Sequence, residues 1–348
     1  MKNKLLGVAQ IGHPERPLLN ASCRYIAGCD VNEALCTQTR EKFGVPTFVR
    51  YEELLKQPGI DVVVIRTPNH LHKAPAIAAL NAGKHVFCEK PLALSLADCR
   101  AMVAAARKAR RLLQINLELR SSLLPARVKE IVDSGEIGEI KRILFHHYQG
   151  AWAHAPDHWR MNLKTSGGIY PEKLVHEVDL FRWFVGEVTH VQSFTGENVL
   201  PQSPFPDCLQ SIFWFRNGAM GYMLHTQTRS AMNVPDTQQH AFGHELWFDL
   251  IGTRGSLRAD HWSGILDVYH LAEGRGAGTR VANFARREDY AALGHSRLAH
   301  DSPTHFCEFV KRIQAGGREI QPPEDMLKTM QLTFAAERSV RTGKKTRV

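Results

Sequence analysis

Short runs of apolar residues with little polar alternation recur through the first third of the chain. They span Lys4–Ile11, Tyr25–Cys29, Val62–Ile65, Lys84–Cys88 and Leu112–Asn116. Runs of this kind predict strands that are buried on both faces of a sheet. Helical patterns, such as Ala34–Phe43 and Ala74–Leu80, separate most of them. We therefore expect an α/β domain with a parallel, Rossmann-type sheet and right-handed crossovers.

From Ile137 onward the pattern changes to strands with turns between them. The strand-like runs are Lys141–Tyr148, Val188–Thr195, Gln210–Phe215, Ala219–Thr226, Glu245–Ile251 and Ser256–Ala259. Asn217-Gly218 between two of them is a strong hairpin signal. Helical patterns near His305–Ala315 and Glu324–Thr342 close the chain. This part predicts an α+β domain with a large, mostly antiparallel open sheet and helices on one side.

The composition is that of an ordinary globular protein, with 43% hydrophobic and 23% charged residues among 348. This length is enough for two domains, which we place at residues 1–120 and 121–348 with the boundary near 118–124. The net charge of +9 draws on two basic clusters, Arg107–Arg111 and Arg341–Arg347. No nucleic-acid-binding motif accompanies them, so we interpret both as solvated segments and expect no nucleic-acid partner.

The sequence also bears on the cellular compartment. No apolar stretch is long enough to span a membrane, and the first residues show no signal-peptide cleavage pattern. The seven cysteines are odd in number and form no CxxC pair. We therefore expect reduced thiols, no structural zinc and a cytoplasmic protein without a membrane partner.

Polar residues follow two neighbouring buried strands where those strands end. They are Thr67, Pro68, Asn69 and His72 after the first strand, and Glu89 and Lys90 after the second. Parallel strands joined by a crossover end at one edge of the sheet, and open α/β sheets bind their ligands at that edge. We therefore expect these side chains to share a binding site.

The same segment carries a motif series that resembles the glucose–fructose oxidoreductase/inositol dehydrogenase (Gfo/Idh/MocA) family. The matching pieces, in order, are Thr67-Pro68-Asn69-x-x-His72, Ala82-Gly83-Lys84-His85-Val86 and Glu89-Lys90-Pro91. The turn Gly252–Leu257 and the two closing helices also resemble the family. The resemblance implies a cofactor domain at 1–120, and a substrate-binding and oligomerisation domain at 121–348. It implies an NAD(P)-dependent enzyme that moves hydride between nicotinamide and a carbinol carbon of a sugar, sugar derivative or cyclitol.

The resemblance also assigns residues to roles. The expected cofactor-binding residues are Gly12, His13, Asp30, Thr67, Pro68, Asn69, His72, Glu89 and Lys90. The expected substrate-binding residues are Lys90, Arg120, Trp159, Arg160, Glu172, His176 and Asp179, with Trp152 as a further loop residue near the substrate. In the expected chemistry Lys90 hydrogen-bonds the reacting hydroxyl, His176 is the general acid/base and Glu172 orients it. Two alternatives stay open: glycoside cleavage through a transient ketone, and a non-catalytic binding protein on the same scaffold.

The spacing of Glu172, His176 and Asp179 supports part of this assignment. Residues three or four apart share one face of a helix. A carboxylate beside an imidazole tunes the tautomer and pKa of that imidazole, as acid/base catalysis requires. Asp179 fits a substrate contact and a structural hydrogen bond equally well.

The clearest departure from a dinucleotide-binding sequence follows the first strand, where Gly-x-Gly-x-x-Gly is expected. In the stretch Gly12–Pro17, prolines replace the second and third glycines. Proline is bulky and lacks the N–H that would donate to phosphate oxygens, so we expect weakened pyrophosphate contacts and a shortened helix. His13 and Arg16 are candidates to compensate. Asp30 closes the second strand as a ribose-binding acid that favours NAD over NADP, or as a helix cap.

Two further predictions concern metals and assembly. Histidines pair at His146 with His147, His154 with His158, and His240 with His244. They lie in strand or loop patterns without an obvious third ligand, so we expect no metal site. Alternating apolar residues in the second sheet would leave one face exposed; examples are Ile212, Trp214, Met220 and Tyr222. We expect a homo-oligomer, a dimer or tetramer, that buries this face.

Overall fold

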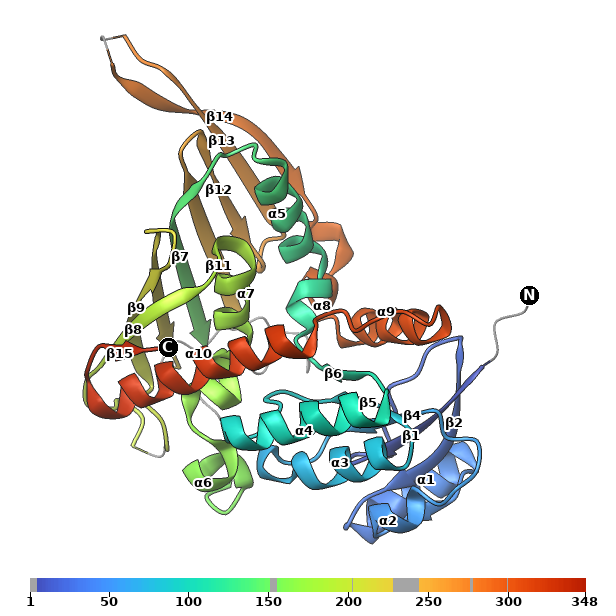
Figure 1. Cartoon of the computed structure of the whole chain (residues 1–348). Helices are drawn as coiled ribbons and strands as arrows, with labels where there is room; N and C mark the ends of the chain where they lie inside the picture. The colour runs from blue at the N-terminus through green and yellow to red at the C-terminus, as the bar shows by residue number, and fades with distance from the viewer. Residues whose placement is uncertain (1–4, 151–154, 202, 228–243, 276–277, 299) are drawn as a thin grey trace. The chain divides into compact units, whose positions relative to one another are not determined.

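The computed structural model (Figure 1) describes residues 5–150, 155–201, 203–227, 244–275, 278–298 and 300–348. The chain divides into two compact units. The first comprises Met1–Leu117, Lys164–Val175 and Ser302–Gln331, and the second comprises Glu118–Leu163, His176–Asp301 and Leu332–Val348. Two later segments thus return to the first unit, which the sequence pattern did not predict. One of them carries Glu172.

The first unit is built on a parallel sheet, as predicted, and the sheet has six strands, of which the short strand at Thr47–Phe48 was not predicted. Its strands are β1 (Leu6–Ile11), β2 (Cys23–Cys29), β3 (Thr47–Phe48), β4 (Val62–Ile65), β5 (His85–Cys88) and β6 (Leu113–Ile115). Their order is β3-β2-β1-β4-β5-β6. The order reverses between β1 and β4, and sheets of this type bind ligands beyond the strand ends at such a switch point.

Helices cover this sheet. They are α1 (Glu33–Phe43), α2 (Tyr51–Leu54), the turn η1 (Asn69–Leu71), α3 (Lys73–Asn81), α4 (Leu96–Ala109) and α9 (Ser302–Gln314). The predicted cap of α4 is present, because the Ser95 hydroxyl accepts a hydrogen bond from the Asp98 amide at 3.1 Å. α9 packs on the sheet through Phe306 and Phe309, whose rings lie 5.3 and 5.6 Å from that of Phe87.

The connection between β1 and β2 contains no helix in residues 12–22. The prediction of a shortened helix is therefore wrong. Pro14 and Pro17 supply no N–H groups to a helical hydrogen-bond ladder, and the side chain of Gln10 ties the loop together instead. Its amide nitrogen donates to the carbonyls of Gly12, His13 and Arg16 at 3.1, 2.6 and 3.2 Å.

The second unit is built on a nine-stranded sheet that is mostly antiparallel, as predicted. Its strands are β7 (Ile140–Gln149), β8 (Val188–Thr195), β9 (Cys208–Phe215), β10 (Met220–Thr226), β11 (His244–Gly252), β12 (Gly255–Asp260), β13 (Ile265–Glu273), β14 (Arg280–Asp289) and β15 (Thr346–Arg347). Their order is β14-β13-β12-β11-β7-β10-β9-β8-β15, in which β7 and β10 form a parallel pair. The strands β13, β14 and β15 were not predicted, and β15 lies in the basic segment Arg341–Arg347, which the sequence pattern suggested was only solvated.

Helices and turns occupy one face of this sheet (Figure 1). The second unit's elements in residues 118–185 and 291–298 are η2 (Glu118–Ser121), α5 (Leu123–Ser134), η3 (Trp159–Met161), α7 (Val175–Val185), η5 (Ala291–Leu293) and α8 (His295–Leu298). By contrast, α6 (Leu163–Ser166) and η4 (Tyr170–Leu174) belong to the segment Lys164–Val175 of the first unit, apart from Leu163. Phe181 of α7 packs against Phe145 and Phe213 of the sheet, with ring centroids 5.8 and 4.8 Å apart. The helix α10 (Pro323–Thr342) contributes to both units. Within the described residues, no helix combines the length and the apolar character needed to cross a membrane.

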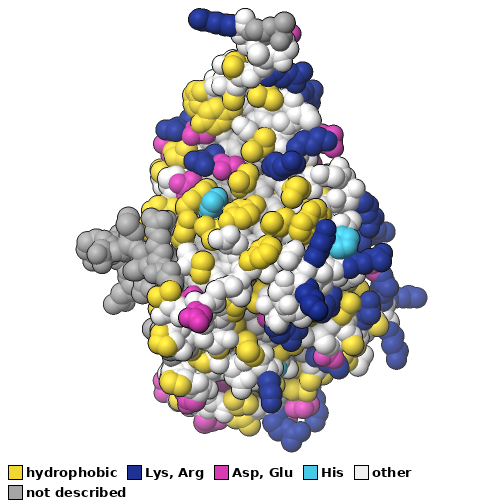
Figure 2. Space-filling view, turned by 90° about the vertical axis from the view of Figure 1, so that its left-hand side faces the viewer, with side chains coloured by type: hydrophobic (Ala, Val, Ile, Leu, Met, Phe, Trp, Pro, Cys, Tyr) yellow, Lys and Arg dark blue, Asp and Glu magenta, His cyan; other side chains and the backbone are white. Residues whose placement is uncertain are grey.

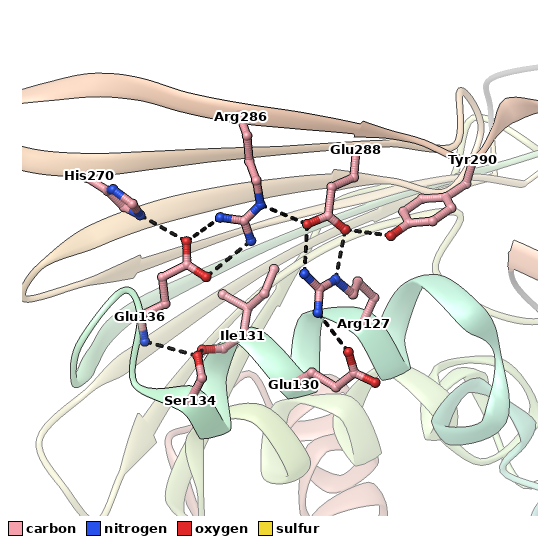
Figure 3. Close-up of polar contacts among 9 residues, drawn as sticks. All are labelled: Arg127, Glu130, Ile131, Ser134, Glu136, His270, Arg286, Glu288 and Tyr290. Carbon is pink, nitrogen blue, oxygen red and sulfur yellow. Dashed lines mark hydrogen bonds and ion pairs between the residues drawn. The ribbon is translucent and has the colours of Figure 1, made fainter.

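Charged side chains attach β13 and β14 to α5 (Figure 3). Arg127 of α5 donates to both carboxylate oxygens of Glu288 at 2.8 and 2.9 Å. Arg286 bridges Glu288 and Glu136, and His270 lies 2.9 Å from Glu136. The hydrogen bond from Arg127 holds the pKa of Glu288 down to about 2. This network is a structural clamp, and none of its members is an expected site residue.

The opposite face of the nine-stranded sheet is partly exposed. Side chains alternate along β7, β9 and β10 between buried positions and positions open to solvent. The open positions include Leu144, Ile212, Trp214, Met220 and Tyr222. Figure 2 shows apolar side chains gathered between charged ones on the face it presents. The predicted alternation is therefore present.

Candidate active site

The ends of β4 and β5 are tied together at one edge of the first unit's sheet. The Glu89 amide donates to the Ile65 carbonyl at 2.9 Å, which continues the strand pairing. The ring of His72 is fully buried and lies 2.7 Å from the Pro91 carbonyl and 3.0 Å from that of Thr67. Burial lowers the pKa of His72. His72 thus fixes the segments after both strands relative to each other.

Three predicted site residues meet at this edge. Asn69 donates to the Glu172 carboxylate at 2.5 Å and to the Ser166 carbonyl at 2.9 Å. The Lys90 ammonium donates to the Glu172 carbonyl and lies 3.7 Å from its carboxylate oxygen Oε1. The side chain of Glu172 is 3% exposed, whereas that of Lys90 is 19% exposed. Lys90 is therefore oriented by two groups of Glu172 while it still reaches solvent.

Gly12 is placed where the first strand passes close to its neighbour. It has φ +84°, and a Cβ there would lie 2.5 Å from the Arg66 carbonyl oxygen. Only glycine accepts both the left-handed backbone and this approach. The first glycine of the family loop is therefore required by the fold even though the others are absent.

Asp30 lies at the end of β2 with both carboxylate oxygens engaged by the backbone. One accepts from the His13 amide at 3.0 Å and the other from the Asn32 amide at 2.9 Å. The cap of α1 is the side chain of Asn32, not that of Asp30. Each carboxylate oxygen has a second lone pair, so Asp30 keeps the capacity to accept from ribose hydroxyls.

Cationic side chains surround the loop after β1. Arg66 donates to the Arg16 carbonyl at 3.0 Å, and its Nε lies 3.7 Å from Glu89 Oε1. The side chains of Arg16 and His13 are 81% and 61% exposed. Arg16 and His13 both lie near the Glu15 carboxylate, at 3.8 and 3.5 Å. Guanidinium groups bind phosphate oxygens, so the presence of Arg16 and Arg66 at this loop is compatible with a dinucleotide.

His176 lies in a separate polar cluster of the second unit. Its Nδ1 is 3.7 Å from Glu118 Oε2, and the other Glu118 oxygen is 2.8 Å from His300 Nδ1. The two imidazole rings meet edge to face with centroids 5.5 Å apart. Burial alone would raise the pKa of Glu118, but the nearby His176 and the hydrogen bond from His300 outweigh it and lower this pKa to about 2.

Asp179 and Arg120 bind each other. Arg120 donates through Nε and Nη2 to the two carboxylate oxygens at 2.6 and 2.7 Å. The exposed fractions of the two side chains are 11% for Arg120 and 2% for Asp179. Arg120 also lies over the ring of Trp183, 5.5 Å from its centroid. This geometry favours the structural interpretation of Asp179 over a direct substrate contact.

The remaining predicted residues are placed as follows. Arg160 stacks over the Trp159 ring at 4.4 Å in the turn η3. His146 stacks on Trp247 with ring centroids 4.9 Å apart, whereas His147 faces Glu177 at 2.9 Å, so this pair does not converge on one point. Trp152, His154 and His240 lie outside the described residues, as does the side chain of His244.

Four residues of these clusters were not predicted as site residues: Gln10, Arg66, Glu118 and His300. Glu118 had a weak signal, because it occupies the position where relatives often have the asparagine of Asn-x-Arg. His300 had none, since it follows no motif and meets Glu118 only through the fold.

Comparison with known proteins agrees with this arrangement. Residues 4–117 match the sequence model of the oxidoreductase family with NAD-binding Rossmann fold (GFO_IDH_MocA), and residues 126–258 match the GFO/IDH/MocA C-terminal domain. Inositol 2-dehydrogenase of Salmonella typhimurium (strain LT2) is 33% identical over 193 residues, which are 54% of this chain and 55% of that protein. The chain therefore spans about half the length of this relative. Myo-inositol 2-dehydrogenase of Thermotoga maritima is 24% identical over 98% of this chain and 96% of its own length.

Solved structures agree in fold. Levoglucosan dehydrogenase in complex with NADH and levoglucosan superposes with a TM-score of 0.80 at 23% identity, covering 99% of both chains. The WlbA dehydrogenase from Bordetella pertussis, in complex with NADH and UDP-GlcNAcA, gives a TM-score of 0.79 at 20% identity and covers 100% of this chain and 99% of its own. The two sequence models match more than two thirds of the chain. With the Rossmann-type sheet and the Lys90 motif in place, the chain belongs to the Gfo/Idh/MocA family of oxidoreductases.

Proposed function

We propose that this protein is an NAD-dependent oxidoreductase that acts on a carbinol carbon of a sugar, sugar derivative or cyclitol. The observation that carries the proposal is the triad of Asn69, Lys90 and Glu172 at the carboxyl edge of the Rossmann-type sheet, in which Asn69 and Glu172 are buried and Lys90 still reaches solvent. Two relatives, at 33% and 24% sequence identity, are named inositol dehydrogenases. Two dehydrogenases of the same fold were solved in complex with NADH.

The cofactor would be held at both ends by groups of the first unit. Asp30 would accept hydrogen bonds from the adenosine ribose and would repel a 2′-phosphate, which favours NAD over NADP. Thr67, Pro68, Asn69 and Glu89 would border the nicotinamide half, with His72 fixing the segments that carry them. Gly12 and His13, together with the guanidinium groups of Arg16 and Arg66, would meet the pyrophosphate. The nicotinamide supplies the hydride acceptor or donor when it is bound.

Side chains of the protein would transfer the proton and stabilise the charge that develops on the substrate. The ammonium of Lys90 would donate a hydrogen bond to the reacting hydroxyl oxygen and stabilise negative charge that develops there. Glu172 orients Lys90 through its carbonyl and carboxylate. We assign His176 as the group that exchanges the hydroxyl proton, with Arg160 and Trp159 as contacts to the sugar ring. The ion pair of Arg120 and Asp179 would stabilise the second unit around the cluster that contains His176.

Calorimetric titration of cofactor-stripped protein with NAD(H) and NADP(H) tests the cofactor. NAD should bind more tightly than NADP, and Asp30→Ala should remove that difference. A preference for NADP would contradict the role of Asp30. Undetectable binding of either cofactor at millimolar concentration would contradict the dehydrogenase itself.

Two lysine variants, one at Lys90 and one at a control position, test the proposed chemistry. Lys90→Ala should lower kcat on inositol or sugar substrates by at least about 100-fold, as expected for loss of a positioned hydrogen-bond donor that stabilises the developing oxyanion. Its NAD affinity should stay within a few-fold of that of the wild type. Lys73→Ala is the matched control, since Lys73 pairs with Asp98 at the surface of the same unit. If Lys90→Ala loses thermal stability but keeps its rate per folded molecule, the lysine is structural.

Two properties of the whole protein complete the proposal. The open face of the nine-stranded sheet would pair with a second copy, because its central strands present Trp214, Tyr222 and other apolar side chains. Light scattering at micromolar concentration measures this, and a monomer would reject it. All seven cysteines are free, which fits the reducing cytoplasm.

A further inference from the structure

Glu118, His176 and His300 bring three metal-ligating side chains to one point in the second unit. Each offers one ligand atom, and these atoms lie within 4.8 Å of one another. The three residues come from distant parts of the chain: η2, α7 and the segment after α8. No other group of three or more such side chains meets this criterion in the described residues.

The carboxylate of Glu118 is buried, unlike the carboxylates of ion pairs at the protein surface. Its side chain is 6% exposed, and its Oε2 accepts no hydrogen bond within the described part of the chain. That oxygen lies on the side of His176, 3.7 Å from Nδ1. A buried ionised carboxylate is costly unless a cation compensates it. The Glu118 carboxylate therefore lies between two imidazoles, and its oxygen on the His176 side lacks a hydrogen-bond donor within the described residues.

The backbone of His300 adopts a conformation that is unfavourable for a histidine. His300 has φ 62°, a left-handed conformation that few residues other than glycine adopt. The next amide, that of Asp301, donates to the Ser122 hydroxyl at 3.2 Å, and this hydroxyl donates to the Glu118 carbonyl at 3.0 Å. His300 is thus anchored to the same turn that carries Glu118. Uncommon backbone conformations that the surroundings enforce concentrate at functional sites.

We propose that Glu118, His176 and His300 bind a divalent first-row transition metal ion, with Zn²⁺ as the expected occupant. Two imidazoles and one carboxylate are a ligand set that holds zinc while leaving a coordination position open. The open position would take water or a hydroxyl of the polyol substrate. Such an ion polarises the oxygen that it binds and orients the ring that carries it.

This site deepens the proposed function and changes the division of labour within it. With the ion bound, His176 is a ligand, and the proton of the metal-bound hydroxyl passes to water, because the metal lowers the pKa of the oxygen that it binds. Without the ion, His176 keeps the acid/base role assigned above. Metal binding itself does not depend on turnover, so its test is independent of the dehydrogenase assay.

The experiment measures metal directly in the full-length protein. Purified protein is stripped with a chelator, and Zn²⁺ is then titrated by calorimetry, with bound metal quantified by elemental analysis after desalting. We expect about one equivalent per chain. Co²⁺ in place of Zn²⁺ should give the d–d absorption of an ion bound by nitrogen and oxygen ligands.

Three variants locate the ion. Glu118→Gln and His300→Ala should each weaken the Kd for Zn²⁺ by at least tenfold, since even outer-shell changes weaken metal sites by about 10–100-fold. His270→Ala is the control, because His270 faces Glu136 at 2.9 Å in a histidine–carboxylate pair away from the cluster. It should bind Zn²⁺ like the wild type.

The outcomes separate the alternatives. Wild-type protein that retains no stoichiometric metal, or a Kd that is unchanged in both variants, would overturn the site and leave a metal-free cluster of Glu118 with two imidazoles. His300→Ala alters a half-exposed side chain, so it keeps the test open if Glu118→Gln does not fold. NAD affinity should be unchanged in both variants, so loss of metal binding is distinguishable from failure of the cofactor proposal.

Discussion

The buried ion pair between Arg120 and Asp179 should be decisive for the stability of the second unit. Both hydrogen bonds are short, at 2.6 and 2.7 Å, and Asp179 is 2% exposed. Asp179→Ala would leave the guanidinium buried without its carboxylate. Removal of one partner from a buried pair costs about 3–5 kcal/mol of unfolding free energy.

A second bidentate pair in the same unit provides the comparison. Arg258 donates to Asp249 at 2.7 and 2.9 Å, so the geometry is nearly the same. Its side chains are 58% and 21% exposed, and solvent therefore screens the interaction. Asp249→Ala should cost only about 0.2–1 kcal/mol. The contrast between the two variants isolates burial from hydrogen-bond geometry.

Urea unfolding followed by tryptophan fluorescence measures the difference. Trp183 lies under Arg120 and helps to report the second unit's transition. The double variant Arg120→Met/Asp179→Leu should recover most of the loss, since an apolar replacement of both partners removes the unpaired charge. If Asp179→Ala unfolds at the wild-type midpoint yet loses turnover, the structural interpretation is refuted and Asp179 is a substrate contact.

Two further predictions concern single groups. The pKa of Glu288 is about 2 when folded and about 4.3 in a free chain, so its pairing with Arg127 stabilises the fold above pH 4.3 and is lost as the pH falls toward 2. The stability difference between wild type and Glu288→Gln in urea should accordingly shrink over that range, and a constant difference would contradict it. Gly12→Ala should weaken NAD binding by calorimetry, because its Cβ would meet the Arg66 carbonyl, whereas Gly44→Ala, also at positive φ but with nothing within 4 Å, should leave NAD binding unchanged.

The sequence predicted the elements whose stability comes from apolar burial. β4 could be predicted because Val62–Ile65 is fully buried on both faces. β14 could not, because Arg280–Asp289 is a mostly polar stretch without an apolar alternation. It is held by the clamp from Arg127 through Glu288, a pair 161 residues apart in the chain. Interactions of that range leave no local pattern.

The same distinction applies to the site. Asn69, Lys90 and Glu172 could be named because each lies in a motif, although their meeting depends on the return of Lys164–Val175 to the first unit. Glu118 and His300 could not be paired from the sequence, since 182 residues separate them. A histidine that lies in no motif can be assigned to a site only when the structure shows which residues surround it.

The loop after β1 shows why a departure from a motif does not settle function by itself. The glycine pattern predicts phosphate binding through a helix N-terminus, and its loss at Pro14 and Pro17 removes that helix. Instead, the buried side chain of Gln10 binds the loop, because its amide nitrogen donates hydrogen bonds to three loop carbonyls. The loop is therefore ordered without a helix, and it leads to Arg16 beside Arg66. Guanidinium groups bind phosphate oxygens through charged hydrogen bonds, so we propose that these side chains replace the missing backbone donors of the motif and that the ligand class is kept.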